Sequence, residues 1–337
     1  MVLEMIRLSN NIARINQFLD KVWPPKKEEK DVPPNWQLFF LSLFAGLVLG
    51  YLIREAPLLG YDWYYLFQRN QATNIYYPPW HYPPWTDIVL GPLAQLPWRL
   101  GLALVNGISI VTVTVLTFRE GAQNPRWRLL AIFMALFSLQ MSVLLWLGHI
   151  DALSLLGILA LPWAIPLVLM KSTFVGFAVF TRKSWFLAAM VFAVLSLAIW
   201  PAWPNQLVST LDFRNEHPSA GGWRQTSLLP VLLGVFLLLK SKRTDLFQTL
   251  AAGAILFPFI LPYHHIILLP ALGSLKGLRL FIAWLAAWLM LVPVMLENYF
   301  WIYFVFPLAI WLFRYTDHEK DQSWYTLVRE FLPINRT

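Results

Sequence analysis

Repeated runs of apolar residues constrain the fold of this chain more than any other feature. Several of them reach roughly 18 residues or more, the length at which a helix crosses a hydrocarbon core of about 30 Å. Of the 337 residues, 58% are hydrophobic and 13% are charged, whereas a soluble domain carries about 25% charged residues. The chain is therefore predicted to be an all-α polytopic membrane protein.

Polar interruptions divide the apolar runs into about ten predicted transmembrane helices. The predicted transmembrane domain covers 36–313, between an N-terminal part, 1–35, and a polar tail, 314–337. Within the N-terminal part, residues 3–22 show the helical stripe of an amphipathic helix that lies on a membrane surface. A proline-bracketed polar linker, 24–35, follows it. The predicted spans are 36–53, 99–118, 129–147, 152–170, 185–200, 227–239, 246–262, 264–275, 280–296 and 300–313.

Lysines and arginines gather on one side of this arrangement. The residues on that side are Lys26, Lys27, Lys30, Arg119, Arg126, Arg128, Lys171, Arg182, Lys183, Lys240, Lys242, Arg243, Lys276, Arg279 and Arg314. The positive-inside rule makes that side, and with it both termini, cytoplasmic. The formal net charge of +8 is then explained by cytoplasmic loops, and no nucleic-acid partner is expected. We expect the protein to reside in the plasma membrane.

Two larger polar segments, 54–98 and 201–226, fall on the opposite, outer side. The first of them includes a short predicted juxtamembrane helix at 86–97. Most carboxylates outside the cytoplasmic loops lie on this side, as do five of the six histidines, His81, His149, His217, His264 and His265. Ionisable groups near membrane depth are costly and usually mark a functional site. The active site is therefore expected on the extracytoplasmic face.

Asp62 is the first candidate catalytic residue. It follows the first predicted span and lies between Tyr61 and Trp63. A carboxylate held in an apolar, partly dry loop can have its pKa raised toward the value that suits a general base. The alternative is that Asp62 caps a helix that begins at Trp63, because Asp is a favoured N-cap residue.

Histidines supply the next candidates. His149 and Asp151 lie where the third predicted span meets the outer side, and they can bind an acceptor hydroxyl or a phosphate; alternatively they satisfy helix ends in a turn. His264 and His265 follow a proline-broken segment. Adjacent residues on a helix point about 100° apart, so at most one of this pair faces the site. With no cysteine and no His-x-x-x-His pair, zinc is disfavoured and no metal is expected.

Outer arginines and aromatics complete the candidate set. A guanidinium binds phosphate bidentately, so Arg69 and Arg224 are candidates for an anionic lipid head group, and interfacial snorkelling or ion pairing is the alternative. The run 76–85 is either an aromatic belt or a sugar-binding surface. Its two Pro-Pro pairs fix the backbone, which a belt does not need. Its candidate binding residues are His81, Tyr82 and Trp85.

Several of these segments resemble glycosyltransferase family 87. The resemblance is carried by the loop aspartate, Asp62, and by the motifs Tyr77-Pro-Pro, Tyr82-Pro-Pro-Trp, Gly91-Pro-Leu-Ala-Gln-Leu-Pro97 and Gly148-His-Ile-Asp-Ala-Leu. The last is similar to the family's Gly-Gln-x-(Asp/Asn)-Ala-Leu. The resemblance spans roughly 36–275 and is densest in 60–155. Three features depart from the family: His149 replaces the usual Gln, Ser172 follows Lys171 where Pro is common, and the chain is shorter than most members.

The resemblance implies a GT-C fold and an inverting transfer of a sugar, mannose being expected, from a polyprenyl-phosphate donor to an extracytoplasmic glycan or glycolipid. It implies that Asp62 is the general base and that a later outer histidine, His264 or His265, lies near the donor phosphate. Arg69 and Arg224 are further phosphate candidates. The candidates for binding the acceptor or the sugar are His81, Tyr82, Trp85, His149 and Asp151. No cofactor is expected beyond the lipid-linked donor.

Two other classes of function compete with a glycosyltransferase. A lipid or glycolipid transporter or flippase would place polar residues along a path through several spans, whereas here they cluster at one face. A non-catalytic scaffold subunit is compatible with the many aromatic residues and the short chain. The oligomeric state stays open, with a monomer as the simplest case.

Overall fold

The chain is all-helical in the part that the computed structural model describes. That part comprises residues 17, 18, 22, 36–53, 60–64, 82–171, 174–205, 228–257, 261–296, 300–315 and 323. Within it, the β pairing consists of one isolated bridge between Lys242 and Ser323. The all-α prediction is confirmed there. Nearly all of the predicted N-terminal surface helix, its linker, the second outer loop and the C-terminal tail lie outside the described residues.

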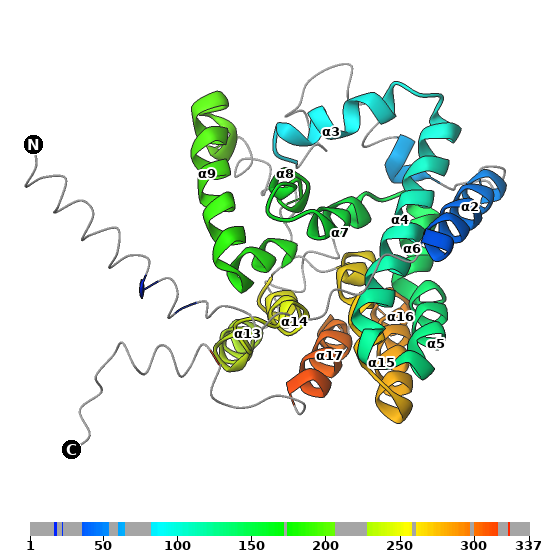
Figure 1. Ribbon diagram of the computed structural model, residues 1–337, viewed down its shortest axis with the longest axis vertical. Helices are drawn as coiled ribbons and strands as arrows, with labels where there is room; N and C mark the ends of the chain where they lie inside the picture. The colour runs from blue at the N-terminus through cyan, green and yellow to red at the C-terminus, as the bar shows by residue number, and fades with distance from the viewer. Residues whose placement is uncertain are drawn as a thin grey trace, which may run out of the picture.

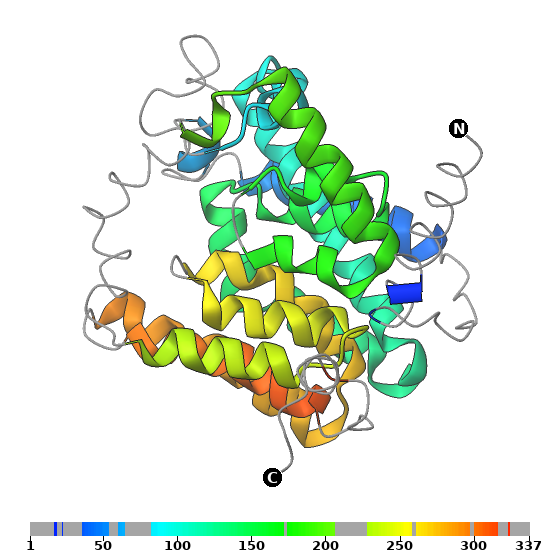
Figure 2. The ribbon, with the colours of Figure 1, turned by 90° about the vertical axis from the view of Figure 1, so that its left-hand side faces the viewer.

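The helices follow one another with short connections. The α-helices are α2 (Trp36–Ile53), α3 (Trp85–Ala94), α4 (Trp98–Glu120), α5 (Pro125–Leu136), α6 (Leu139–Leu147), α7 (Asp151–Leu159), α8 (Ile165–Val168), α9 (Lys183–Ile199), α13 (Leu229–Lys240), α14 (Leu246–Leu256), α15 (Gly277–Leu289), α16 (Leu291–Met295) and α17 (Val305–Tyr315). The 3₁₀ helices are η3 (Gly121–Gln123), η4 (Phe174–Thr181), η5 (Pro262–Ser274) and η6 (Phe300–Phe304). In Figure 2 the yellow-to-red helices from α13 onward lie in the lower half of the molecule.

Helix α4 joins two polar regions at opposite ends of the molecule. At a rise of about 1.5 Å per residue, its 23 residues span about 34 Å. At its start, the carbonyl of Trp98 accepts a hydrogen bond from the indole of Trp63, at 3.1 Å. At its far end, a carboxylate oxygen of Glu120 lies 3.0 Å from Nη1 of Arg314. The apolar length between these ends is packed against α2, α5, α7 and η5 (Figure 1).

Small residues bring α2 against α4. A Cβ added to Gly46 would lie 2.9 Å from the Cα of Gly107, and one added to Gly50 would lie 2.8 Å from the Cα of Ala103. The spacing of four residues on both helices is the small-xxx-small pattern by which membrane helices approach each other closely. This contact fixes α2 beside α4 (Figure 1), and so fixes where the chain enters the segment that contains Asp62.

The segment predicted as the fourth span, 152–170, does not form a single crossing. Helix α7 ends at Leu159, and the short α8 folds back so tightly that a Cβ on Gly157 would lie 2.8 Å from the backbone nitrogen of Val168. As a result, Nζ of Lys171 lies 2.6 Å from Oδ2 of Asp151. Residues in contact cannot lie on opposite sides of a layer about 30 Å thick. The predicted span was wrong, and Lys171 and Asp151, which were assigned to opposite sides, lie on the same side.

Prolines explain why this apolar run turns back. Pro162 lies in the turn between α7 and α8, and Pro166 lies in the first turn of α8. Proline has no backbone N–H and clashes with the preceding helical turn, so it ends a helix or begins a new one. An apolar run of this length has the same composition whether it forms one helix or a hairpin.

The third predicted span, 129–147, is a bent pair. Helices α5 and α6 meet at 44°. At the bend, the indole N–H groups of Trp284 and Trp288 both donate to the carbonyl of Phe137, at 2.9 and 3.2 Å. The Ser138 hydroxyl accepts from the Met141 N–H at 3.3 Å and caps α6. The bend therefore satisfies backbone groups that a kink would otherwise leave without partners.

By length and composition, the described residues contain one helical stretch that can cross a membrane, Trp98–Gln123. The bent pair α5–α6 is a second if it counts as one span. The other apolar helices of the described residues are shorter than this stretch.

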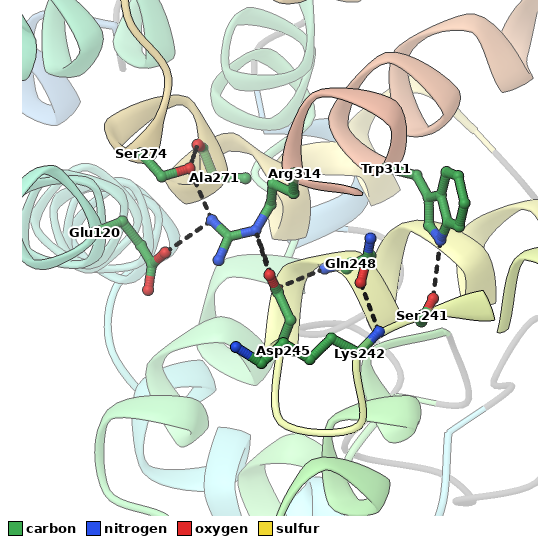
Figure 3. Close-up of polar contacts among 9 residues, drawn as sticks. All are labelled: Glu120, Ser241, Lys242, Asp245, Gln248, Ala271, Ser274, Trp311 and Arg314. Carbon is green, nitrogen blue, oxygen red and sulfur yellow. Dashed lines mark hydrogen bonds and ion pairs between the residues drawn. The ribbon is translucent and has the colours of Figure 1, made fainter. Parts of the chain in front are cut away.

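Side chains from four elements meet at the C-terminal end of α4. Arg314 on α17 donates to both carboxylate oxygens of Asp245, at 2.9 and 3.0 Å, and to the Ser274 hydroxyl at 2.7 Å. It also donates to Glu120, at the end of α4. Figure 3 shows this Arg314 network and the neighbouring Trp311–Ser241 hydrogen bond. The network ties α4, α14, η5 and α17 together.

Candidate functional site

Polar side chains gather at the other end of α4, where segment 60–64, α7 and η5 meet. We call this group the histidine–carboxylate cluster. It consists of Asp62, Tyr82, His149, Asp151, Lys171, Tyr263 and His264.

Two anchors hold Asp62 in place. Gly60, at φ 77°, donates its N–H to the carbonyl of Trp146 at 2.8 Å. The side chain of Trp63 is fully buried and donates to the Trp98 carbonyl. Asp62 lies between these anchors, with its side chain 13% exposed. It is therefore a nearly buried carboxylate on a fixed backbone.

A left-handed glycine turn delivers His149 to the cluster. Gly148, at φ 68°, ends α6, and its N–H donates to the carbonyl of Leu144 at 2.9 Å. A side chain would be strained at this φ and would also collide with Leu102 and Trp63. The turn places His149 outside both helices, and Asp151 then begins α7.

The imidazole of His149 lies between two carboxylates. Its Nδ1 contacts Oδ2 of Asp151, and its Nε2 lies 3.8 Å from Oδ2 of Asp62. The Tyr82 hydroxyl lies 3.4 Å from the same Nε2. On one face, the ring of Tyr263 packs at a centroid distance of 4.3 Å. The ring is thus fixed by partners at its edges and by an aromatic face.

Lys171 supplies the positive charge of the cluster. Its ammonium lies 2.6 Å from Asp151, 3.2 and 3.3 Å from the two ring nitrogens of His149, and 5.1 Å from the centroid of the Tyr263 ring. Burial alone would raise the pKa of Asp151. The charge of Lys171 and the interaction with His149 outweigh burial and hold that pKa far below its ordinary value. Asp151 is therefore ionised at neutral pH.

Asp62 has the opposite electrostatic character. Burial raises the pKa of its carboxyl, and the nearby Asp151 acts in the same direction, while His149 and Lys171 partly oppose the rise. Two carboxylates of one cluster thus have pKa values pushed apart. That arrangement is typical of sites in which one group exchanges a proton and the other stays charged.

The side chains of the two adjacent histidines, His264 and His265, point in different directions. His264 lies at a ring centroid distance of 6.3 Å from His149 and 4.6 Å from Tyr263. Its Nδ1 accepts the N–H of Leu261 at 3.2 Å, so the neutral ring carries its proton on Nε2 and is a donor there. The structure does not bring His265 to the cluster, because successive residues of a 3₁₀ helix point about 120° apart. His265 is fully buried between Phe174 and Phe306.

Only some of the predicted acceptor-binding residues belong to the cluster. Tyr82 joins the cluster through its hydroxyl. Trp85 lies in a buried aromatic group, with ring centroids 4.9 Å from Phe192 and 5.0 Å from Trp203. It packs in the core. His81, Arg69 and Arg224 lie outside the described residues.

Sequence reasoning missed Lys171 and Tyr263. Lys171 was read as the cytoplasmic end of a span, and the prolines inside 152–170 were the signal that the chain turns back. Tyr263 precedes the histidine pair and received no role. Within the described residues, no group of three or more His, Asp and Glu side chains is arranged to hold a metal ion.

Comparisons with protein-family models, with curated proteins and with solved structures found no match to this chain.

Proposed function

We propose that this protein is an integral membrane glycosyltransferase of the GT-C fold. It transfers a sugar, with mannose as the expected one, from a polyprenyl-phosphate donor to an extracytoplasmic glycan or glycolipid. The observation that carries the proposal is the nearly buried Asp62 carboxylate, 3.8 Å from His149, whose ring also contacts the ammonium of the buried Lys171–Asp151 ion pair. This pairing of a proton acceptor with a positive charge suits the attack of a hydroxyl on a carbon that bears a phosphate.

Exposed apolar faces support a membrane location. Soluble monomers rarely expose large contiguous apolar surfaces. The exposed large apolar side chains on α2, α9, α13 and α15 include Phe40, Phe44, Leu52, Met190, Val194, Leu195, Leu229, Leu232, Phe236, Leu278, Leu285 and Leu289. The α4 length of about 34 Å between the two polar regions matches a bilayer core of about 30 Å. About ten crossings are proposed, with 151–171 as a re-entrant hairpin in place of the crossing first assigned to 152–170.

The proposed reaction is a single displacement with inversion. The acceptor hydroxyl oxygen attacks the anomeric carbon while Asp62 removes its proton. The bond from that carbon to the phosphate oxygen breaks, and its electron pair leaves with the polyprenyl phosphate. The Lys171 ammonium and the Nε2–H of His264 are the donors of the cluster suited to the leaving phosphate. Tyr82 and Tyr263 offer rings to the sugar.

The test uses the full chain reconstituted in proteoliposomes. The probe is polyprenyl-phosphate mannose carrying a carbon-14 label in the sugar, supplied with extracted membrane glycolipids and glycans as acceptors. Transfer by the wild type and its loss in Asp62→Asn are the expected results. Asp87→Asn, at a carboxylate on α3, is the matched control and should retain transfer. Full transfer by Asp62→Asn would contradict the assigned base, and translocation of the donor without transfer would favour a flippase.

A further inference from the structure

We infer that His149 is a proton carrier: its Nε2 receives the proton that Asp62 takes from the acceptor hydroxyl. The inference rests on the proposed function and adds a step to it. Without that step, each turnover would leave a proton on a nearly buried carboxylate that must lose it before the next turnover.

The position of His149 is the first argument. The imidazole joins the two carboxylates in a line, with Asp151 at Nδ1 and Asp62 at 3.8 Å from Nε2. The His149 side chain is 3% exposed and that of Asp62 is 13% exposed, so His149 holds the proton inside the cluster and Asp62 lies on its way back to water. A separation of 3.8 Å is beyond a hydrogen bond, but catalytic contacts are often long before substrate binds.

The tautomer of His149 is the second argument. Asp151 is ionised beside Lys171 and can only accept hydrogen bonds, so the Nδ1 that contacts it carries the hydrogen. The backbone N–H of Ile150 lies 3.0 Å from the same Nδ1 and would favour the other tautomer. A hydrogen bond to a carboxylate is roughly twice as strong as one between neutral groups, so the contact with Asp151 determines the tautomer. Nε2 is then the acceptor, and the Tyr82 hydroxyl at 3.4 Å donates to it.

The charges around the ring are the third argument. The groups facing His149 are Asp62, Tyr82, Asp151, Lys171, Tyr263 and His264. They comprise two carboxylates and one ammonium, so a proton on the imidazole compensates a negative charge that Lys171 leaves unmatched. In the reaction the phosphate leaves with an additional negative charge. A proton kept on His149 offsets that charge until the proton returns to water. The transfer steps therefore balance without any further reactant.

The kinetic test compares wild type with His149→Gln. Glutamine retains an N–H for Asp151 but cannot take a proton. We expect transfer of the labelled mannose to fall roughly tenfold to a hundredfold. The pH–rate profile should change as well, because Asp62 no longer has an imidazole with which to exchange its proton. His265→Gln is the matched control, since His265 lies in the core. An unchanged rate and profile in His149→Gln would overturn the carrier role and leave the proposed function standing.

A second measurement needs no substrate. Nitrogen-15 NMR of the full chain labelled at its six histidines identifies the His149 signal by its loss in His149→Gln. The expected neutral form has its proton on Nδ1, and its Nε2 signal should move in Asp62→Asn but not in Asp87→Asn. A proton on Nε2, or no response to Asp62→Asn, would overturn the inference even if transfer were observed.

Discussion

The ammonium of Lys171 lies 2.6 Å from a carboxylate oxygen of Asp151, a residue 20 positions earlier in the chain. This contact closes the α7–α8 hairpin and places both of its ends in the histidine–carboxylate cluster. It also keeps Asp151 charged in a fully buried position, where it orients His149. One ion pair thus serves the local fold and the electrostatics of the site.

Removal of Lys171 should destabilise the protein more than its single charge suggests. Lys171→Met leaves the buried Asp151 carboxylate without its cation, at an expected cost of about 3–5 kcal/mol. Asp151→Asn in the same chain should recover part of this loss, because the neutral amide needs no counter-ion. The measurement is the unfolding midpoint in detergent. Lys276→Met, at an exposed lysine, is the control, and an equal loss in both single variants would refute the argument.

The acid limb of transfer should lie above the pH expected of an ordinary aspartate. Burial raises the pKa of Asp62 above its ordinary value of 3.8, and the base must be ionised, so the rate falls as the pH drops through the raised pKa. Lys171 opposes this rise. Lys171→Met should therefore move the limb to still higher pH in pH–rate profiles of the protein that remains folded. A limb that moves to lower pH would contradict the assignment.

A rise in pH affects stability in the opposite direction to transfer. Because the folded state favours protonated Asp62, its ionisation costs stability as the pH rises from the ordinary pKa through the raised one. Asp62→Asn removes that cost. At neutral pH this variant should unfold at the same or a higher temperature than the wild type, although it has lost transfer. A lower unfolding temperature would indicate that Asp62 is a structural residue.

The Arg314 network should be as sensitive as the cluster, at the opposite end of α4. Arg314→Met leaves Asp245 and Glu120 without their shared guanidinium (Figure 3) and should cost about 3–5 kcal/mol. Arg314→Lys should recover only part of this, because an ammonium cannot contact both carboxylates through a planar fork. Arg126→Met, at an exposed arginine on α5, is the control in thermal unfolding. Equal midpoints for all three variants would exclude a structural role.

The sequence predicted the helical class and five members of the cluster, and three of these, Asp62, His149 and Asp151, were found through simple signals. The apolar runs required helices, and the isolated Asp62 and the His149–Asp151 pair were visible as ionisable groups at the ends of such runs. The order of these residues along the chain also indicated that they share one end of the molecule. Hydropathy and charge are local properties, and they were sufficient for these features.

Lys171 and His265 show which features of the site cannot be predicted from hydropathy and charge alone. Whether 152–170 crosses or turns back depends on how α8 packs against Gly157, and both outcomes have the same hydropathy. Which of two adjacent histidines faces the site depends on the rotation of η5, which is set by packing against Phe174 and Phe306. The long helix expected from the third span likewise bends where two distant tryptophans bind Phe137.

Labelling from the two sides of a membrane tests the proposed topology. The chain has no native cysteine, so single cysteines report directly. Gln95, near the start of α4, and Gln123 and Lys276, near its far end, are all exposed. An impermeant maleimide should label Gln95→Cys in intact cells, and Gln123→Cys and Lys276→Cys only after permeabilisation. The reverse pattern would invert the molecule and place Asp62 in the cytoplasm.

Packing between α2 and α4 gives the last prediction. An alanine in place of a helical glycine ordinarily stabilises, but a Cβ on Gly50 would lie 2.8 Å from both the Cα and the carbonyl oxygen of Ala103. These are backbone atoms, so the helices must separate, at a cost of about 1–3 kcal/mol. Gly176→Ala is the control, because its nearest neighbour would be a Leu169 methyl at 3.6 Å. Gly50→Ala should lower the thermal midpoint and also slow transfer, since α2 leads into the segment that holds Asp62; equal midpoints for the two alanine variants would show that the close approach of α2 and α4 is not needed.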